Sequence, residues 1–328
     1  MAEGTTELAF DVYGLRIGVS GDWPEVVEAL RRDFAWFPVA TGPEGAGASV
    51  RITRRSPDLT GFGRLDATSV SWRSVEYRDS GRRIVDFGRA VAIDDGVGHL
   101  TVDGDHGWMV WRASHDFLLG RIGEHLDRIG LARVNGLGLA GPAGATLVVL
   151  PMGGGKTTLA LRALAAGGIG FLSEASPLLD RAGRLHPFPL PLLVRSTSPD
   201  APSLPAEHLR RLHGIDHDPE ALEVSAFRHA VPDGPVPLRH VVLGTRTLGA
   251  EPELVRIPWH RAAPEAARAM IAGFGILRGG GIRGVAPSLW ETRMRIAAFV
   301  AALRGAQPWQ LRLGVDKDAN WNALARLL

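Results

Sequence analysis

One stretch constrains the fold of this chain more than any other: an apolar segment, a glycine-rich loop and a helix-forming segment in succession. Residues 146–150 are apolar and rich in β-branched side chains, and residues 156–166 carry Leu and Ala at helical spacing. The loop between them ends in the run Gly153, Gly154, Gly155, Lys156, Thr157 and Thr158. This order of strand, glycine loop, Lys-Thr and helix is that of a phosphate-binding P-loop. The sequence therefore predicts an α/β protein with this loop at the end of a buried strand.

The residue types in the loop match the chemistry of a bound nucleoside triphosphate and Mg²⁺. Backbone N–H groups of the glycines and of the following helix hold phosphate oxygens, so residues 153–158 are predicted to bind nucleotide. Lys156 would reach the β- and γ-phosphates, and the Thr157 hydroxyl would ligate Mg²⁺. The alternative is a glycine-rich turn with an incidental lysine. Against it, only two of the 37 basic residues are lysines, Lys156 and Lys317.

The loop departs from the motif at one position. The motif has glycine six residues before the lysine, where this chain has Leu150. Leucine does not readily adopt a positive φ. We therefore expect the chain to leave the strand by a path that suits leucine.

Composition excludes several other classes of protein. Hydrophobic residues make up 45% of the 328 residues, enough for a sizeable core, and the absence of cysteine excludes disulfides and thiolate metal sites. The net charge is only +2 and the charges are interspersed, which argues against a nucleic-acid partner. No apolar run reaches membrane-spanning length, so we expect no membrane association and a cytoplasmic location, where ATP is available.

Residues 1–113 are predicted to form a β-rich N-terminal domain with one helix. Apolar and polar residues alternate over residues 7–19 with a phase shift at Gly14, which indicates two short strands or a bulge. A helix with Val26, Val27 and Leu30 on one face follows. Further strands are expected at residues 49–53, 69–77, 83–87, 90–93, 99–102 and 108–111. Four acids beside glycines are expected in turns rather than in a catalytic pair: Asp94, Asp95, Asp103 and Asp105.

Residues 114–328 are predicted to form the P-loop domain, with a mixed sheet flanked by helices. Ser114 would cap its first helix, and a hairpin over residues 137–150 would lead into the loop. The strand after the loop helix ends at Glu174. A P-loop enzyme needs an acid at a neighbouring strand end to hold Mg²⁺ or accept the proton of the attacking hydroxyl. Glu174 is the preferred candidate, and Asp180, which looks like a hairpin tip, is the second choice.

A second glycine cluster, at residues 273–284, contains Arg278 and Arg283. Arginines in such a loop would grip a transferring phosphoryl group. A plain loop is the equally weighted alternative.

Residues 131–195 resemble the C-terminal domain of HPr kinase/phosphorylase, a fold related to PEP carboxykinase. The likeness is closest to the small HPr-kinase-like proteins of bacterial peptide-maturation clusters. It rests on the hairpin before the loop, on the Gly153–Thr158 run, on Phe171–Glu174 and on His186–Pro189. The family's two strand-end aspartates align with Glu174 and Ala175, and a family histidine aligns with Asn135.

The resemblance implies an ATP- and Mg²⁺-dependent kinase that transfers the γ-phosphoryl group to a hydroxyl, such as a serine of a peptide or small protein. It implies catalytic roles for Lys156 and Glu174, metal ligation by Thr157 and Glu174, and a substrate contact near Asn135. The altered positions keep open a nucleotide-binding accessory protein with weak catalysis, and the unknown pocket walls keep open a small-molecule kinase. The choice of ATP over GTP and the formation of a homo-oligomer also stay open.

Overall fold

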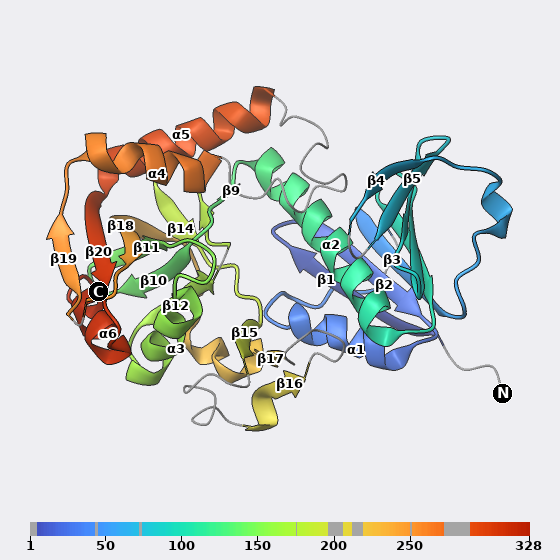
Figure 1. Cartoon of the computed structure of the whole chain (residues 1–328), viewed down its shortest axis with the longest axis horizontal. Helices are drawn as coiled ribbons and strands as arrows, with labels where there is room; N and C mark the ends of the chain where they lie inside the picture. The colour runs from blue at the N-terminus through green and yellow to red at the C-terminus, as the bar shows by residue number, and fades with distance from the viewer. Residues whose placement is uncertain are drawn as a thin grey trace. The chain divides into compact units, whose positions relative to one another are not determined.

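The computed structural model describes residues 5–42, 45–71, 74–174, 176–195, 206–211, 219–249, 251–271 and 289–328. These residues form two compact units, which divide between His125 and Leu126. The described part of the chain contains two large mixed sheets, of eight and nine strands, and six α-helices (Figure 1). The predicted mixed α/β class is therefore confirmed, as is a β-rich N-terminal region.

The first unit is built on the eight-stranded sheet, with the strand order β1-β2-β3-β8-β7-β6-β5-β4. Its strands are β1 (Thr6–Val12), β2 (Leu15–Gly21), β3 (Ala48–Arg54), β4 (Ala67–Val70), β5 (Val75–Asp79), β6 (Arg82–Asp86), β7 (Ala90–Asp94) and β8 (His99–Gly104). Strand β3 pairs in parallel with β2 and β8, and the other pairs are antiparallel. Of the two alternatives at Gly14, two strands are confirmed: Gly14 lies in the turn of the β1–β2 hairpin, with a φ of 87°.

Two helices contribute to this unit: α1 (Pro24–Asp33) and the part of α2 (Gly107–Ile129) that precedes the division. The apolar face predicted for α1 is buried. Two expectations about α2 were wrong. Residues 108–111 are helical rather than a strand, and Ser114 lies inside the helix, where its hydroxyl donates to the Val110 carbonyl at 2.8 Å. The predicted boundary at residues 113–114 therefore falls within a continuous helix.

The second unit is built on the nine-stranded sheet, ordered β12-β10-β11-β18-β14-β13-β9, with β20 also pairing with β18 and β19 with β20. Its strands are β9 (Ala132–Arg133), β10 (Leu137–Gly141), β11 (Gly144–Val149), β12 (Gly170–Glu174), β13 (Leu178–Leu179), β14 (Arg184–His186), β18 (Val236–Arg246), β19 (Glu253–Arg256) and β20 (Gln307–Leu313). A small sheet is ordered β15 (Leu192–Arg195), β17 (Pro219–Leu222) and β16 (Leu209–Arg211). Short 3₁₀ turns occur at Thr60–Phe62, Ala206–His208, Val224–Ala226 and Arg228–Ala230.

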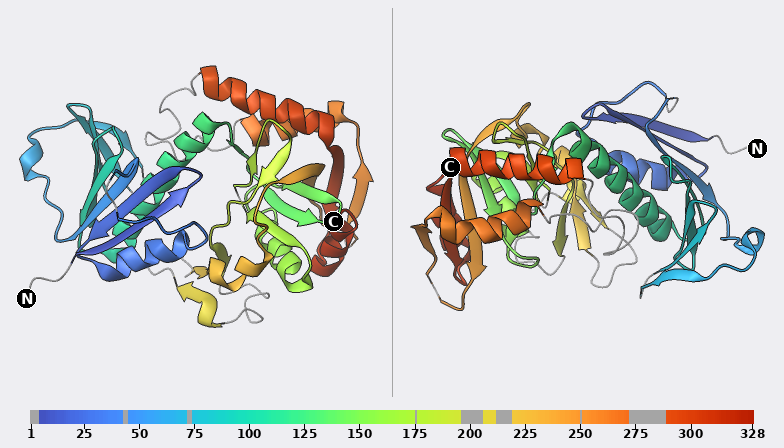
Figure 2. Two further views of the ribbon diagram at one scale, coloured as in Figure 1. Left: turned by 180° about the vertical axis from the view of Figure 1, so that it is seen from behind. Right: turned by 90° about the horizontal axis from the view of Figure 1, so that it is seen from above.

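Helices lie on both sides of the nine-stranded sheet. On one side α3 (Lys156–Ala166) packs with α6 (Lys317–Ala325), and on the other α4 (Trp259–Ile271) packs with α5 (Leu289–Gly305), as Figures 1 and 2 show. Buried alanines on α4 and α5 let these helices approach the sheet closely; they are Ala262, Ala266, Ala269, Ala298 and Ala302. No helix in the described part of the chain is both long and apolar enough to cross a membrane.

Candidate nucleotide-binding site

Four strands of the second unit end at the same edge of the nine-stranded sheet. Strand β18 pairs in parallel with β11 and with β20, while β12 and β11 are both antiparallel to the strand between them, β10. The carboxyl ends of β12, β11, β18 and β20 therefore meet there. In open α/β sheets, ligands bind outside the carboxyl ends of the strands. The P-loop, Glu174 and Arg246 all lie at this edge.

The glycine run is required by the path of the backbone. Gly153 and Gly155 have φ values of 71° and 106°, in the left-handed region that only glycine enters at little cost. At Gly154 a Cβ atom would lie 2.9 Å from the Pro151 carbonyl oxygen. Helix α3 then begins without a side-chain cap, so its first N–H groups are available to an anion.

Leu150 is accommodated by a glycine on the neighbouring strand. As expected, it is not required to adopt a positive φ. Its side chain is buried against Gly244 of β18, where a Cβ atom would lie 2.8 Å from Leu150 Cγ. The glycine that the motif places at the loop entrance is therefore absent here, and a glycine across the sheet makes room for leucine.

Lys156 is folded back onto the loop. Its Nζ donates to the carbonyl oxygens of Leu150 at 2.9 Å and Pro151 at 3.2 Å, and the residue is only 8% exposed. Burial lowers the pKa of the ammonium group, and the opposite charge of Glu174 acts against this shift. The lysine is thus held by polar groups at the loop rather than by apolar contacts.

Glu174 faces the start of α3. The Thr157 hydroxyl donates to Glu174 Oε1 at 3.2 Å. Burial raises the pKa of the carboxyl group, and the Thr157 hydrogen bond and the Lys156 charge act in the opposite direction. A raised pKa makes a carboxylate a stronger proton acceptor than an ordinary one.

The Thr157 and Glu174 oxygens also fit a magnesium ion. A hydroxyl and a carboxylate are hard oxygen donors, and Mg²⁺ is usually held by one or two such groups together with water and substrate phosphates. The described residues contain no cluster of three or more His, Asp or Glu that would hold a metal independently. Thr157 and Glu174 would supply part of the Mg²⁺ coordination shell, with water and substrate phosphates as the other ligands.

The second-choice acid, Asp180, serves the hairpin between β13 and β14. It accepts from the backbone of Ala182 and Arg184 and from the side chains of Arg184 and His186. Burial would raise its pKa, but the hydrogen bonds from His186 and Arg184 outweigh burial and lower it. Asp180 is thus engaged in a turn, while Glu174 faces the loop.

The remaining predicted residues have different outcomes. Asn135 lies at the same sheet edge, because it precedes β10 by two residues and Leu137, the first residue of β10, pairs with Glu174 and Val148. Asn135 is exposed, and its backbone N–H donates to the Ala269 carbonyl at 3.2 Å. Thr158 lines a small cavity beside the loop. Ala175, Arg278 and Arg283 lie outside the described residues.

Sequence reasoning missed Arg246 and Lys317, which line the same cavity as Thr158. One signal was present. Lys317 is the only lysine besides that of the P-loop.

The chain matches no known protein-family model, and no curated protein shows significant similarity to it.

Proposed function

We propose that this protein is an ATP- and Mg²⁺-dependent phosphotransferase that moves the γ-phosphoryl group of ATP to a hydroxyl. The observation that carries the proposal is the convergence of Lys156, Thr157 and Glu174 around a glycine loop at the carboxyl edge of a sheet. A structural turn would not need a lysine at a helix start facing an acid from another strand of the same sheet edge. The resemblance to HPr-kinase-like proteins supports the same activity, a fold of that type and a serine acceptor in a peptide or small protein.

Each residue has a defined task in this scheme. Lys156 would leave the two loop carbonyls and donate to the phosphates, where its charge stabilises the transferring group. Thr157 and Glu174 would hold Mg²⁺, which neutralises phosphate charge when bound. The acceptor oxygen forms a bond to the γ-phosphorus as the bond to the β–γ bridging oxygen breaks and ADP leaves. Glu174 would take the proton of the acceptor hydroxyl.

The test compares the whole protein with its Lys156→Ala variant. ATP binding is measured by titration calorimetry with Mg²⁺, and transfer from γ-labelled ATP is measured to water and to a library of serine peptides. We expect Lys156→Ala to lower the rate of transfer about 10²- to 10³-fold, because one preorganised cationic donor is lost. Arg51→Ala, which removes an exposed charge from β3 in the other unit, is the control and should leave the rate unchanged.

The outcomes separate the alternatives. Equal ATP binding and turnover in wild type and Lys156→Ala would refute a catalytic P-loop. Tight binding of ATP by the wild type, without turnover on water or on any peptide, would instead identify a nucleotide-binding accessory protein.

A further inference from the structure

A small cavity lies beside the P-loop, away from Glu174. It has a volume of about 80 Å³ and is bounded on the loop side by Gly154, Gly155 and Thr158, and on the other side by Arg246, Gly314 and Lys317. Pockets that enclose a whole drug-sized ligand measure about 300–1,000 Å³. The cavity can therefore receive one part of a nucleotide only.

The strand order explains why this cavity and Glu174 lie on opposite sides of the loop. Strand β11 enters the loop; β12, with Glu174, lies two strands away in one direction, and β18 and β20 follow in the other. Successive residues of a helix point about 100° apart. Accordingly Thr157 reaches Glu174, while Thr158, the next residue, lines the cavity.

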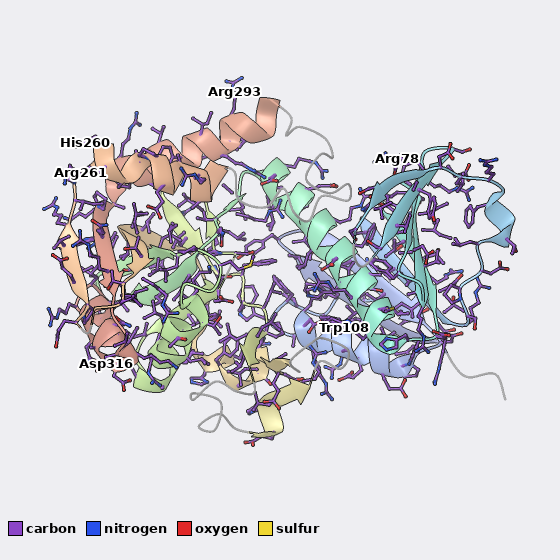
Figure 3. The ribbon with its side chains drawn as sticks, in the orientation of Figure 1. Arg78, Trp108, His260, Arg261, Arg293 and Asp316 are labelled. Carbon is purple, nitrogen blue, oxygen red and sulfur yellow. The ribbon has the colours of Figure 1, made fainter. Side chains whose placement is uncertain are left out.

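The segment that carries Lys317 is held in a fixed conformation. Asn320 is buried, accepts from the Gly314 N–H at 2.8 Å and donates to the Gly314 carbonyl at 3.0 Å. Asp316, labelled in Figure 3, caps α6 by accepting from the N–H groups of Asp318 and Ala319. The backbone of Lys317 is therefore positioned before any ligand arrives.

The charges of the cavity indicate what it binds. Arg246 and Lys317 are cationic and stand next to a loop whose own groups suit the β- and γ-phosphates. The metal and the acceptor hydroxyl would occupy the Glu174 side. The α-phosphate and the sugar must then leave the loop in another direction.

We propose that the α-phosphate and ribose of a bound nucleoside triphosphate lie against this cavity and are contacted by Arg246 and Lys317. The inference rests on the proposed function of the P-loop. It adds two binding residues and gives the orientation of the bound nucleotide. The nucleoside would lie on the β18–β20 side of the loop, and the acceptor hydroxyl on the β12 side.

The test measures the dissociation constants of ATP and of inorganic pyrophosphate for the whole protein and for the double variant Arg246→Met/Lys317→Met. Pyrophosphate can fill the β- and γ-positions but has no α-phosphate or sugar. We expect ATP to bind at least about tenfold more weakly to the variant, because charge-assisted hydrogen bonds are lost. Pyrophosphate binding should change less than about twofold.

The control is Arg256→Met, which removes an exposed charge from β19 outside the cavity and should change neither constant. Unchanged ATP binding in the double variant would overturn the inference. Equal weakening of ATP and pyrophosphate would also overturn it, because the two cations would then act on the loop itself. If the wild type fails to bind ATP, the proposed function fails, which is a distinct result.

Discussion

Asp95 of the first unit and Glu174 of the second unit have opposite surroundings. In the first unit, Asp95 accepts N–H groups from Val97, Gly98 and His99, and these bonds outweigh the effect of burial and lower its pKa. In the second unit, Glu174 accepts only one hydroxyl hydrogen bond within the described residues, and burial raises its pKa. Several hydrogen-bond donors stabilise the ionised form of a carboxylate in a turn. A buried carboxylate with few donors takes up a proton more readily.

Three further acids near glycines in the first unit also have hydrogen-bond or ion-pair partners. Asp94 accepts from the Gly96 N–H and from Arg121, Asp103 pairs with Arg55, and Asp105 pairs with Arg89. Asp95 and Asp105 lie outside the strands, as expected for turn residues, but Asp94 ends β7 and Asp103 lies within β8, so the expectation of a turn was wrong for these two. The comparison thus contrasts Glu174 with acids that have structural partners, and three sets of variants can break or sharpen it.

The largest effect is expected from Glu174→Gln. Loss of a general base lowers the rate of phosphoryl transfer about 10²- to 10⁴-fold. In the wild type, kcat/KM should fall as the pH is lowered through the pKa of Glu174, because protonation removes the base; burial raises this pKa in the metal-free site. The pH–rate profile measures both effects.

Glu174→Asp is the matched variant, since it keeps a carboxylate with one methylene fewer. It should retain part of the activity and the acid limb of the profile. If Glu174→Gln reacts at the wild-type rate, or if its kcat/KM still falls at low pH as in the wild type, Glu174 is not the base.

A smaller effect, on stability, is expected from Asp127→Ala. The Asp127 side chain is fully buried and accepts from Arg133 at 3.2 Å and Arg295 at 2.8 Å, joining the end of α2 to β9 and α5. Removing one partner leaves buried positive charge, so the free energy of unfolding of this unit should fall by about 3–5 kcal/mol. Urea denaturation measures the loss.

Asp105→Ala is the counterpart in the first unit. Its pair with Arg89 is exposed, at 58% and 41% for the two side chains, so the expected loss is at most about 1 kcal/mol. Equal losses in the two variants would show that burial of the Asp127 cluster does not matter.

The smallest effect is expected from Gly244→Ala. The added methyl group would press on buried Leu150 and cost about 1–3 kcal/mol of stability, and it should also weaken ATP binding by displacing the loop entrance. Gly104→Ala, which would place a methyl group 3.0 Å from the Arg89 carbonyl in the first unit, should destabilise that unit without changing ATP affinity. The double variant Leu150→Ala/Gly244→Ala should recover part of the lost affinity. Equal ATP affinities for Gly244→Ala and Gly104→Ala would contradict the role given to Leu150.

The sequence predicted features set by neighbouring residues. The β1–β2 hairpin, the buried face of α1, and the strand, loop and helix around Lys156 all depend on local patterns. The strand prediction for residues 108–111 was wrong because Trp and Val favour strands, while their actual conformation is set by contacts with α1. One such contact is the hydrogen bond that the Trp111 indole N–H donates to Asp33 at 2.7 Å. Arg246 and Lys317 could not be predicted together, since they meet only because β18 and β20 pair in parallel.

The carbonyl contacts of Lys156 have a consequence for selectivity. An ammonium group that already has two acceptors gains little from exchanging them for another neutral oxygen. An incoming anion, by contrast, adds the attraction of a full negative charge for the ammonium group, which a neutral carbonyl oxygen lacks. The loop should thus favour anionic ligands over uncharged molecules of similar shape.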